Sequence, residues 1–219
     1  MVEPPIVDPP QAEAALIAGW TFDEGKGDTV TDSSGNGFSG IIMGNPSWVP
    51  GVRGTALDFD GEGDYVTCSD DPQFQTPQAF SVSVWVNIRA VHGNWAAIVT
   101  KGDNSWRLAL SGSSTRADFA WGTGAEGWPA AVSNTEMALG EWYHLCGTFA
   151  AGDGGRIYVN GIEDNYRAYD NAMTVGDYPV MIGENAQATG RFFDGSIDEV
   201  WLYRKALTAS EVLSLSREN

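Results

Sequence analysis

Apolar and polar residues alternate along much of the chain with a period of two. From Phe80 to Ile88 every second residue is apolar, and the residues between them are mainly serine, asparagine and tryptophan. Because successive side chains of a β-strand point to opposite faces, this pattern predicts a strand with one buried face. Similar runs are separated by glycine-rich turn sequences such as Ser34–Gly37 and Asn160–Gly161. Many short strands joined by tight turns predict an all-β fold, a two-sheet antiparallel sandwich.

The two ends of the chain depart from this pattern. Thr208 and Glu211 have the spacing of a helix capping box, with Val212 and Leu213 following, so we expect a short C-terminal helix. Residues 1–15 contain four prolines among acidic and polar residues, which predicts a stiff acidic linker. Residues 16–219 are then one domain, a size that suits a single β-sandwich. A linker at the front indicates a longer parent polypeptide with other domains.

The formal net charge of −17 limits the possible partners. A charge of this sign repels nucleic acid, anionic lipid and polyanionic glycans, so neutral or cation-bridged ligands are expected. No stretch of sequence resembles a signal peptide or a membrane-spanning helix, so membrane insertion is not expected. Cys68 and Cys146 are either buried thiols or a single disulfide, and the sequence leaves both possibilities open.

Three blocks in the last third of the chain carry a resemblance to a known family. They are Glu141–His144, Arg156–Gly161 and Phe193–Tyr203. Their order and spacing resemble those of bacterial laminin-G-like and pentraxin-like modules of the concanavalin A-like lectin and glucanase superfamily. The resemblance covers about Gly19–Leu215 and implies a jelly-roll sandwich. It also implies an extracellular or cell-surface module that binds a ligand rather than catalyses a reaction.

A glycoside hydrolase or lyase on the same fold is one alternative. The β-glucanases and laminarinases of this fold would place two glutamates and an aspartate on alternate residues of one strand. The chain has no such triplet, and its nearest candidate, Glu62–Asp64, contains a turn glycine. His92 and His144 lie in no recognisable nucleophile or zinc motif. We therefore predict no enzymatic activity and assign no catalytic residue.

The aromatic content favours carbohydrate binding. The chain has nine tryptophans, and sugars stack their C–H faces on aromatic rings while polar side chains bind their hydroxyls. Two segments, Lys101–Arg107 and Trp121–Trp128, combine both kinds of residue with glycine. Four other tryptophans lie in strand patterns and are assigned mainly to packing: Trp20, Trp85, Trp142 and Trp201. A structural spacer or a protein-recognition domain remains the alternative, because the fold alone does not decide the function.

The pentraxin resemblance extends this candidate site. In pentraxins an Asp-Asn pair and an acidic cluster after Ile-Gly together hold the calcium that bridges to the ligand. The pair matches Asp103 and Asn104, and Glu184 and Asn185 match the start of the cluster, but the residues that follow are not acidic. Because the acidic cluster is incomplete, we expect these residues to bind the ligand directly and not through a calcium ion. The predicted ligand-binding residues are Asp103, Asn104, Trp106, Arg107, Trp121, Trp128, Glu184 and Asn185.

A structural Ca²⁺ ion is also implied by resemblance. Asp198 opens a strand similar to the final strand of β-glucanase sandwiches, whose first aspartate binds calcium. Oxygen ligands from the other end of the chain would complete the site, and the predicted set is Asp23, Asp32, Asn36, Gly40 and Asp198. The alternative is that Asp32 and Asn36 only stabilise a turn through their own backbone.

Overall fold

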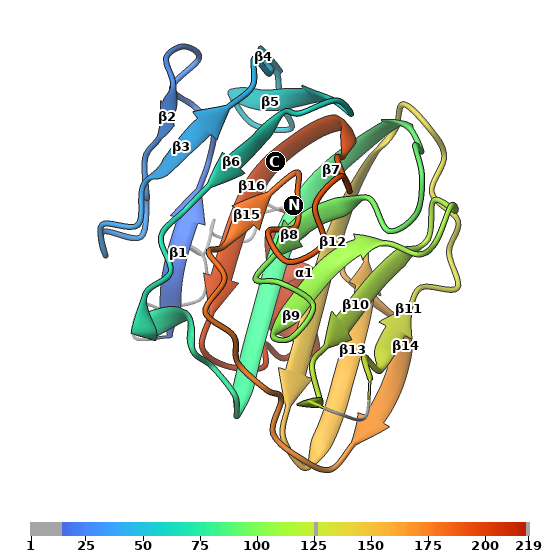
Figure 1. The fold of residues 1–219 in the computed structure, drawn as a ribbon. Coiled ribbons are helices and arrows are strands. Elements are labelled where there is room, and N and C mark those ends of the chain that lie inside the picture. The colour runs from blue at the N-terminus through green and yellow to red at the C-terminus, as the bar shows by residue number, and fades with distance from the viewer. Residues whose placement is uncertain (1–14, 125–126, 218–219) are drawn as a thin grey trace, which may run out of the picture.

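The computed structural model describes residues 15–124 and 127–217. These residues form two antiparallel sheets packed face to face, as the sequence predicted, and one short α-helix follows them (Figure 1). The predicted linker lies, except for Ala15, outside the described residues.

The first sheet, sheet A, has the strand order β14-β13-β12-β7-β16-β5-β4, and β1 also pairs with β16. In chain order its strands are β1 (Leu16–Trp20), β4 (Ser47–Pro50), β5 (Thr55–Asp60), β7 (Ala79–Ala90), β12 (Trp142–Ala150), β13 (Asp153–Val159), β14 (Ile162–Tyr169) and β16 (Asp194–Tyr203). The longest strands, β7 and β16, lie side by side in its centre.

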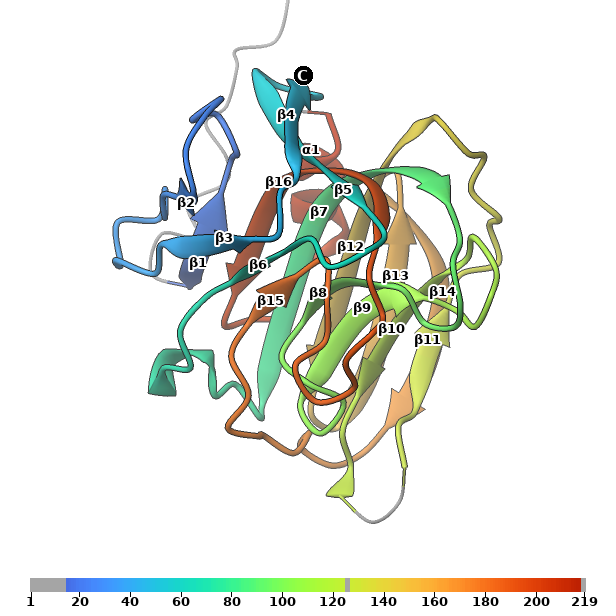
Figure 2. The same cartoon turned by 45° about the horizontal axis from the view of Figure 1, so that its top comes forward.

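The second sheet, sheet B, has the order β11-β10-β9-β8-β15-β6-β3-β2 (Figures 1 and 2). Its strands are β2 (Thr29–Val30), β3 (Gly40–Met43), β6 (Tyr65–Thr67), β8 (Ala97–Thr100), β9 (Trp106–Leu110), β10 (Ala117–Trp121), β11 (Ala130–Val132) and β15 (Met181–Ile182). A 3-10 turn, η1 (Pro72–Phe74), precedes β7. The paired strands of both sheets are antiparallel throughout the described residues, which confirms the jelly-roll sandwich.

The core lies between the two sheets. The alternate apolar residues of β7 are all buried there, as predicted: Phe80, Val82, Val84, Val86 and Ile88. From sheet B, Phe119 and Trp121 point toward Gly147 and Gly155 of sheet A. A Cβ atom on either glycine would overlap the facing ring. The two glycines therefore give the large aromatic rings of β10 their space in the core.

A β-bulge interrupts β16. Residues before the bulge pair with β5, and residues after it pair with β1, so the bulge lets one strand change its neighbour. Glu199 lies in the bulge with a positive φ of 51°, a conformation that is strained for a residue with a side chain. The bulge leaves Asp198 facing the β4–β5 loop, where one carboxylate oxygen accepts the backbone N–H of Arg53 at 3.1 Å.

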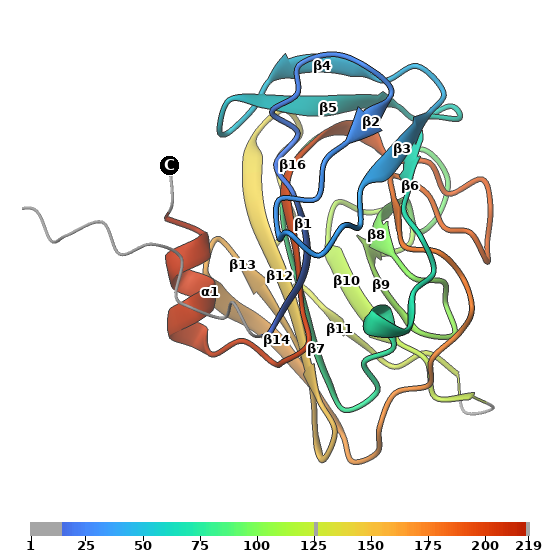
Figure 3. The same cartoon turned by 90° about the vertical axis from the view of Figure 1, so that its left-hand side faces the viewer.

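The C-terminal helix α1 (Ala209–Leu215) packs on the side of sheet A that faces away from sheet B (Figure 3). The predicted capping box of Thr208 and Glu211 is present at its start. Val212 and Leu215 bury a second, small cluster on the sheet, which includes Cys146. Cys68 lies instead in the main core, and both cysteines are free thiols.

Candidate functional site

The outer face of sheet B carries a cation and an anion on adjacent strands. On β9 and β10, Trp106 and Phe119 point into the core, so Arg107 and Asp118 point to the opposite face. Each charged residue lies across from an alanine of the neighbouring strand: Arg107 pairs with Ala120, and Asp118 with Ala109. The small side chains leave the long guanidinium room to lie along the sheet.

Asp103 organises the charged groups around Arg107. Its Oδ1 accepts hydrogen bonds from Nη1 of Arg107 at 3.1 Å, from Nδ2 of Asn185 at 2.9 Å and from Nη1 of Arg191 at 3.0 Å. Asp103, Arg107 and Asn185 are buried. Three predicted site residues from two distant segments thus meet in one network. With Asp118 included, the network contains two arginines and two aspartates, so its formal charges balance.

Glu184 and Asn185 shape the loop that borders this network. The carboxylate of Glu184 accepts the backbone N–H groups of Asn185 at 2.7 Å, Gly190 at 2.8 Å and Arg191 at 3.0 Å. These three N–H groups occupy the carboxylate of Glu184, which therefore holds the loop that carries Arg191. Asn104 is exposed beside the network, and its backbone N–H donates to Oε1 of Gln187 at 2.8 Å.

The network is incomplete at Arg107 and Asp118. Nη2 of Arg107 lies 3.8 Å from Oδ1 of Asp118, which is too long for a hydrogen bond. Nε of Arg107 and Oδ1 of Asp118 are buried and have no hydrogen-bond partner in the described part of the chain. Burial raises the pKa of Asp118 although Arg107 opposes the shift. A hydroxyl group, which both donates and accepts, is suited to bridge these two side chains.

An exposed tryptophan lies next to the network. The ring centroid of Trp95 is 5.7 Å from Cζ of Arg191, and the residue is 39% exposed. Its φ of 54° is positive, so its loop holds a strained conformation. Trp95, Asp118 and Arg191 were not among the residues predicted from the sequence. For Trp95 the signal was present, because His92–Trp95 has the same mixture of glycine, polar and aromatic residues as the two segments that were chosen.

Two of the three predicted stacking tryptophans are core residues, which corrects the prediction. Trp106 is 1% exposed and stacks on Phe80 with a centroid distance of 4.2 Å. Trp121 is fully buried and packs against Phe149. Neither ring can stack on a sugar at the surface. Trp128, in contrast, is 52% exposed and remains available to a ligand.

The five predicted calcium ligands divide between a turn that contains Asp32 and Asn36, strand β3 with Gly40, and the β4–β5 loop, which Asp23 and Asp198 approach. Asp32 accepts hydrogen bonds from the backbone N–H groups of Gly19, Ser34 and Phe38, and Asn36 donates to the carbonyl of Ile17. Burial alone would raise the pKa of Asp32, yet these donors hold it below its ordinary value. Asp32 and Asn36 thus hold a turn against β1, which was the alternative reading.

The remaining predicted calcium ligands lie elsewhere. Gly40 is buried in β3, where a side chain would overlap Val66. Asp23 and Asp198 both approach the β4–β5 loop, where Asp23 accepts the N–H of Thr55 at 3.0 Å. Within the described residues, no three His, Cys, Asp or Glu side chains are grouped to hold a metal ion. Asp23 and Asp198 are therefore the two members of the set that one ion beside this loop could use.

A comparison with models of protein families identifies the family to which the chain belongs. The model of the Concanavalin A-like lectin/glucanases superfamily, Laminin_G_3, matches residues 60–213. The chain therefore belongs to this family, as its C-terminal blocks indicated. A search of the curated proteins found no match. None of the described helices is long and apolar enough to cross a membrane.

Solved structures share the fold. Domain 4 of AbnA, a GH43 extracellular arabinanase from Geobacillus stearothermophilus, in complex with arabinotriose, is 24% identical, with a TM-score of 0.75 over 93% of this chain and 98% of that domain. The binding domain of Paraclostridial Mosquitocidal Protein 1 is 16% identical, with a TM-score of 0.77 over 94% of this chain and 52% of that one. A structure of botulinum neurotoxin type C, whose cell entry depends on two ganglioside molecules, is 13% identical, with a TM-score of 0.71 over 94% of this chain and 51% of that one. The chain thus spans about half of each toxin chain.

Proposed function

We propose that the chain is a non-catalytic carbohydrate-binding module of a larger extracellular protein, and that it binds a neutral glycan on the outer face of sheet B. The observation that carries the proposal is the pairing of an exposed indole, Trp95, with a buried polar network that is unsatisfied at Arg107 and Asp118. A sugar ring would stack on the indole and place a hydroxyl between the two charged side chains.

The charge of the network supports a neutral ligand. Arg107 and Arg191 are balanced by Asp103 and Asp118, and the chain as a whole carries a net charge of −17. An acidic glycan would meet no excess positive charge here. The arabinotriose complex of the AbnA domain, an accessory domain of an extracellular enzyme with the same fold, supports both the ligand class and the extracellular setting.

Calorimetric titration with a panel of neutral oligosaccharides tests the proposal. The panel contains arabinotriose, cellotetraose and β-1,4-galactotetraose. We expect at least one sugar to bind, and Trp95→Ala to weaken that binding about tenfold, the upper end for one aromatic contact. Asp118→Asn should weaken it as well, because the variant removes the charge that pairs with Arg107. Tyr166→Ala is the matched control, since Tyr166 on β14 is 39% exposed, like Trp95.

Different results of this titration would contradict the proposed site and the proposed function. If a sugar binds and Trp95→Ala has no effect, the site is wrong. If none of a broad set of neutral glycans binds, the spacer or protein-recognition role replaces carbohydrate binding. The absence of catalysis is tested separately: we expect no release of reducing ends from β-glucans, galactans or alginate, because the chain has no in-phase acid triplet.

A further inference from the structure

The outer face of sheet A, on the opposite side of the molecule from the site above, carries three tryptophans close together. In the register of the sheet, Trp201 lies opposite Ser83, two residues before Trp85 on β7, and Trp142 lies opposite Asn87, two residues after it. All three tryptophans are half-buried. The outer face of an antiparallel sheet is normally polar where it meets solvent. Three neighbouring indoles on this face therefore indicate an interaction surface.

The rings are held in fixed positions. The ring of Trp201 lies over Gly19 of β1, where a Cβ atom would overlap it. The ring of Trp85 meets the edge of His144 with a centroid distance of 5.4 Å. Helix α1 covers the neighbouring cluster around Cys146 and reaches the rim of this region through Leu215. The indoles are therefore rigid surfaces that lose little entropy when a ligand packs on them.

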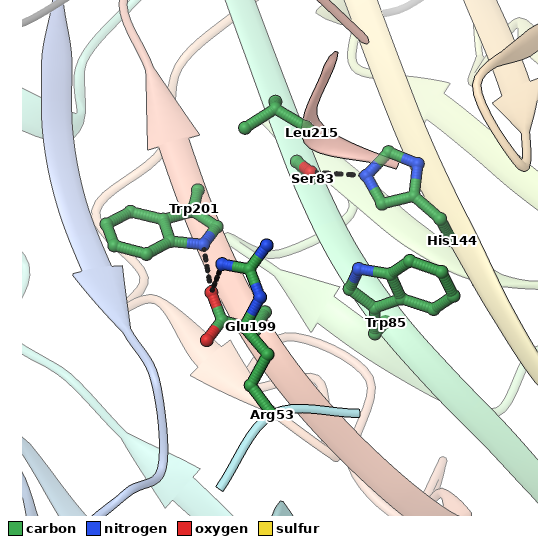
Figure 4. Close-up of a pocket in the computed structure, with 7 residues that line it drawn as sticks. All are labelled: Arg53, Ser83, Trp85, His144, Glu199, Trp201 and Leu215. Carbon is green, nitrogen blue, oxygen red and sulfur yellow. Dashed lines mark hydrogen bonds and ion pairs between the residues drawn. The ribbon is translucent and has the colours of Figure 1, made fainter. Parts of the chain in front are cut away.

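Figure 4 shows the first of two hollows on this face. Trp85 and Trp201 stand on two sides of it, with the side chains of Arg53 and Glu199 between them. Nε1 of Trp201 donates to Oε2 of Glu199 at 2.9 Å, and Nη1 of Arg53 lies 3.6 Å from the same oxygen. The strained bulge of β16 holds Glu199 in this place. The hollow is small, with a volume of about 10 Å³, and it has aromatic sides and a floor formed by the Arg53–Glu199 ion pair.

The second hollow adjoins the first along β7. It is open, with a volume of about 390 Å³, which lies within the roughly 300–1,000 Å³ of small-molecule sites. Asn87, Arg89 and Ser196 contribute polar groups to it, and Leu139 an apolar rim. Asn87 lies two residues after Trp85 on the same face of the strand, about 7 Å further along.

In the second hollow one cation, Arg89, is paired with two carboxylates. Nη1 of Arg89 lies 2.6 Å from Asp58, and Nε of Arg89 lies 2.6 Å from Asp194. Ser196 donates to the other oxygen of Asp58 at 2.7 Å. The cation is therefore matched by carboxylates, so an acidic ligand is not favoured, while both donors and acceptors line the surface. Polar groups of both kinds beside rigid aromatic rings match the surface of a neutral sugar.

We infer that the outer face of sheet A is a second carbohydrate-binding surface, on which a neutral oligosaccharide lies along β7 across both hollows. Trp85 and Trp201 would contact sugar units that lie over the first hollow, and Asn87 and Ser196 would contact units in the second, next to Trp142 on the neighbouring strand. A chain of several sugar units fits better than a single sugar, because the lining residues of the two hollows extend along β7 from Ser83 to Arg89, a length of about 20 Å. This surface is independent of the Trp95 site on the other face.

The indole N–H signals of the full chain in two-dimensional ¹⁵N NMR test the inference, since each tryptophan gives its own signal. The sugars are the panel used above. We expect the signals of Trp85, Trp142 and Trp201 to shift saturably with at least one sugar, and to do so equally in the Trp95→Ala variant. Trp85→Ala should weaken this binding about tenfold, while Tyr166→Ala on the edge strand β14 leaves it unchanged.

The signals also separate the two sites. If only the Trp95 signal shifts, the second surface is wrong and the proposed site stands. If only the Trp85, Trp142 and Trp201 signals shift, the second surface stands and the site on sheet B is wrong. If no tryptophan signal shifts with any sugar, both are wrong. Should Trp85→Ala fail to fold, Asn87→Ala takes its place, because Asn87 makes one hydrogen bond, to the carbonyl of Gly140.

Discussion

The buried histidine of sheet A gives a prediction about stability against pH. His144 on β12 is 1% exposed, and its Nε2 shares a hydrogen bond of 2.8 Å with the hydroxyl of Ser83. Its Nδ1 is buried without a hydrogen-bond partner in the described part of the chain. Burial lowers the pKa of His144 from 6.5 to about 3. The folded protein therefore keeps this imidazole neutral at every pH from 7 down to about 4.

The unfolded chain takes up a proton at this histidine near its ordinary pKa of 6.5, and the folded chain does not. Stability from this group is complete above pH 6.5 and is lost as the pH falls toward 3. Between pH 7 and pH 5 the free energy of unfolding falls by about 2 kcal/mol. This value is RT times the logarithm of the ratio of the unfolded-state proton-binding terms at pH 5 and pH 7 for a pKa of 6.5. For a domain of this size that corresponds to roughly 4–8 °C in the melting temperature.

Asp198 acts in the opposite direction. Burial, opposed in part by the N–H of Arg53, raises the pKa of Asp198 from 3.8 to about 7. Its folded form binds a proton before its unfolded form does, so its contribution to stability grows as the pH falls through 7. The parent protein will therefore show a small net dependence between pH 7 and pH 5. The contribution of His144 must be measured as a difference between variants.

The double variant Ser83→Ala/His144→Phe isolates that contribution. It replaces both partners of the hydrogen bond by apolar groups, which costs less than leaving one unpaired. We expect the free energy of unfolding of the double variant, relative to the parent, to increase by about 2 kcal/mol from pH 7 to pH 5 in urea titrations. Ser83→Ala alone keeps the imidazole and should follow the parent. A difference that stays constant over this pH range would show that the imidazole takes up its proton in the folded state, and the reasoning would fail.

Two further predictions concern the core and the metal. Trp121→Ala should lower the free energy of unfolding by about 3–5 kcal/mol in urea titrations because the ring is fully buried, whereas the exposed Trp128→Ala should change it by no more than about 0.5 kcal/mol; equal effects would place Trp121 at the surface. If calcium binds beside the β4–β5 loop, calcium at ~100 Kd should stabilise the fold by roughly 2.7 kcal/mol in thermal melts. Asp198→Ala should abolish this shift and Asp32→Ala should keep it, while a melting temperature unchanged by EDTA would exclude the ion.

The fold could be predicted almost completely because its signals are local. Alternation over Phe80–Ile88 and the Thr208–Glu211 box each depend on a few neighbouring residues. The site depends on contacts that are distant in sequence. Asp103 and Asn185 were predicted to lie together only through a family resemblance, and nothing in the sequence indicated that Arg191 would bond the same carboxylate. For the predicted calcium set the contacts are local instead: Gly19, Ser34 and Phe38 donate to the carboxylate of Asp32, and Asp23 and Asp198 are the members of the set that approach the β4–β5 loop.

The phase of each tryptophan within its strand, rather than the composition of the surrounding segment, decides which face of the sheet it occupies. Trp106 is in phase with Leu108, and Trp121 with Phe119, so both point into the core although polar, glycine-rich segments flank them. Trp85 is out of phase with Val84 and Val86 and points outward.

The phase within the strand also explains why Trp142 and Trp201 point outward. Trp142 shares its phase with His144, while Leu145 and Phe149 face the core; Trp201 lies between Val200 and Leu202, which are both buried. Because side chains alternate strictly between the two faces, a large apolar residue that is out of phase with its strand's apolar series must lie on the outer face. There it either is covered, as Cys146 is by α1, or takes part in binding. In the described structure α1 covers the Cys146 cluster, against which Trp201 also packs, while Trp85, Trp142 and Trp201 themselves remain half-buried; this partial exposure is why we infer a binding surface on the outer face of sheet A.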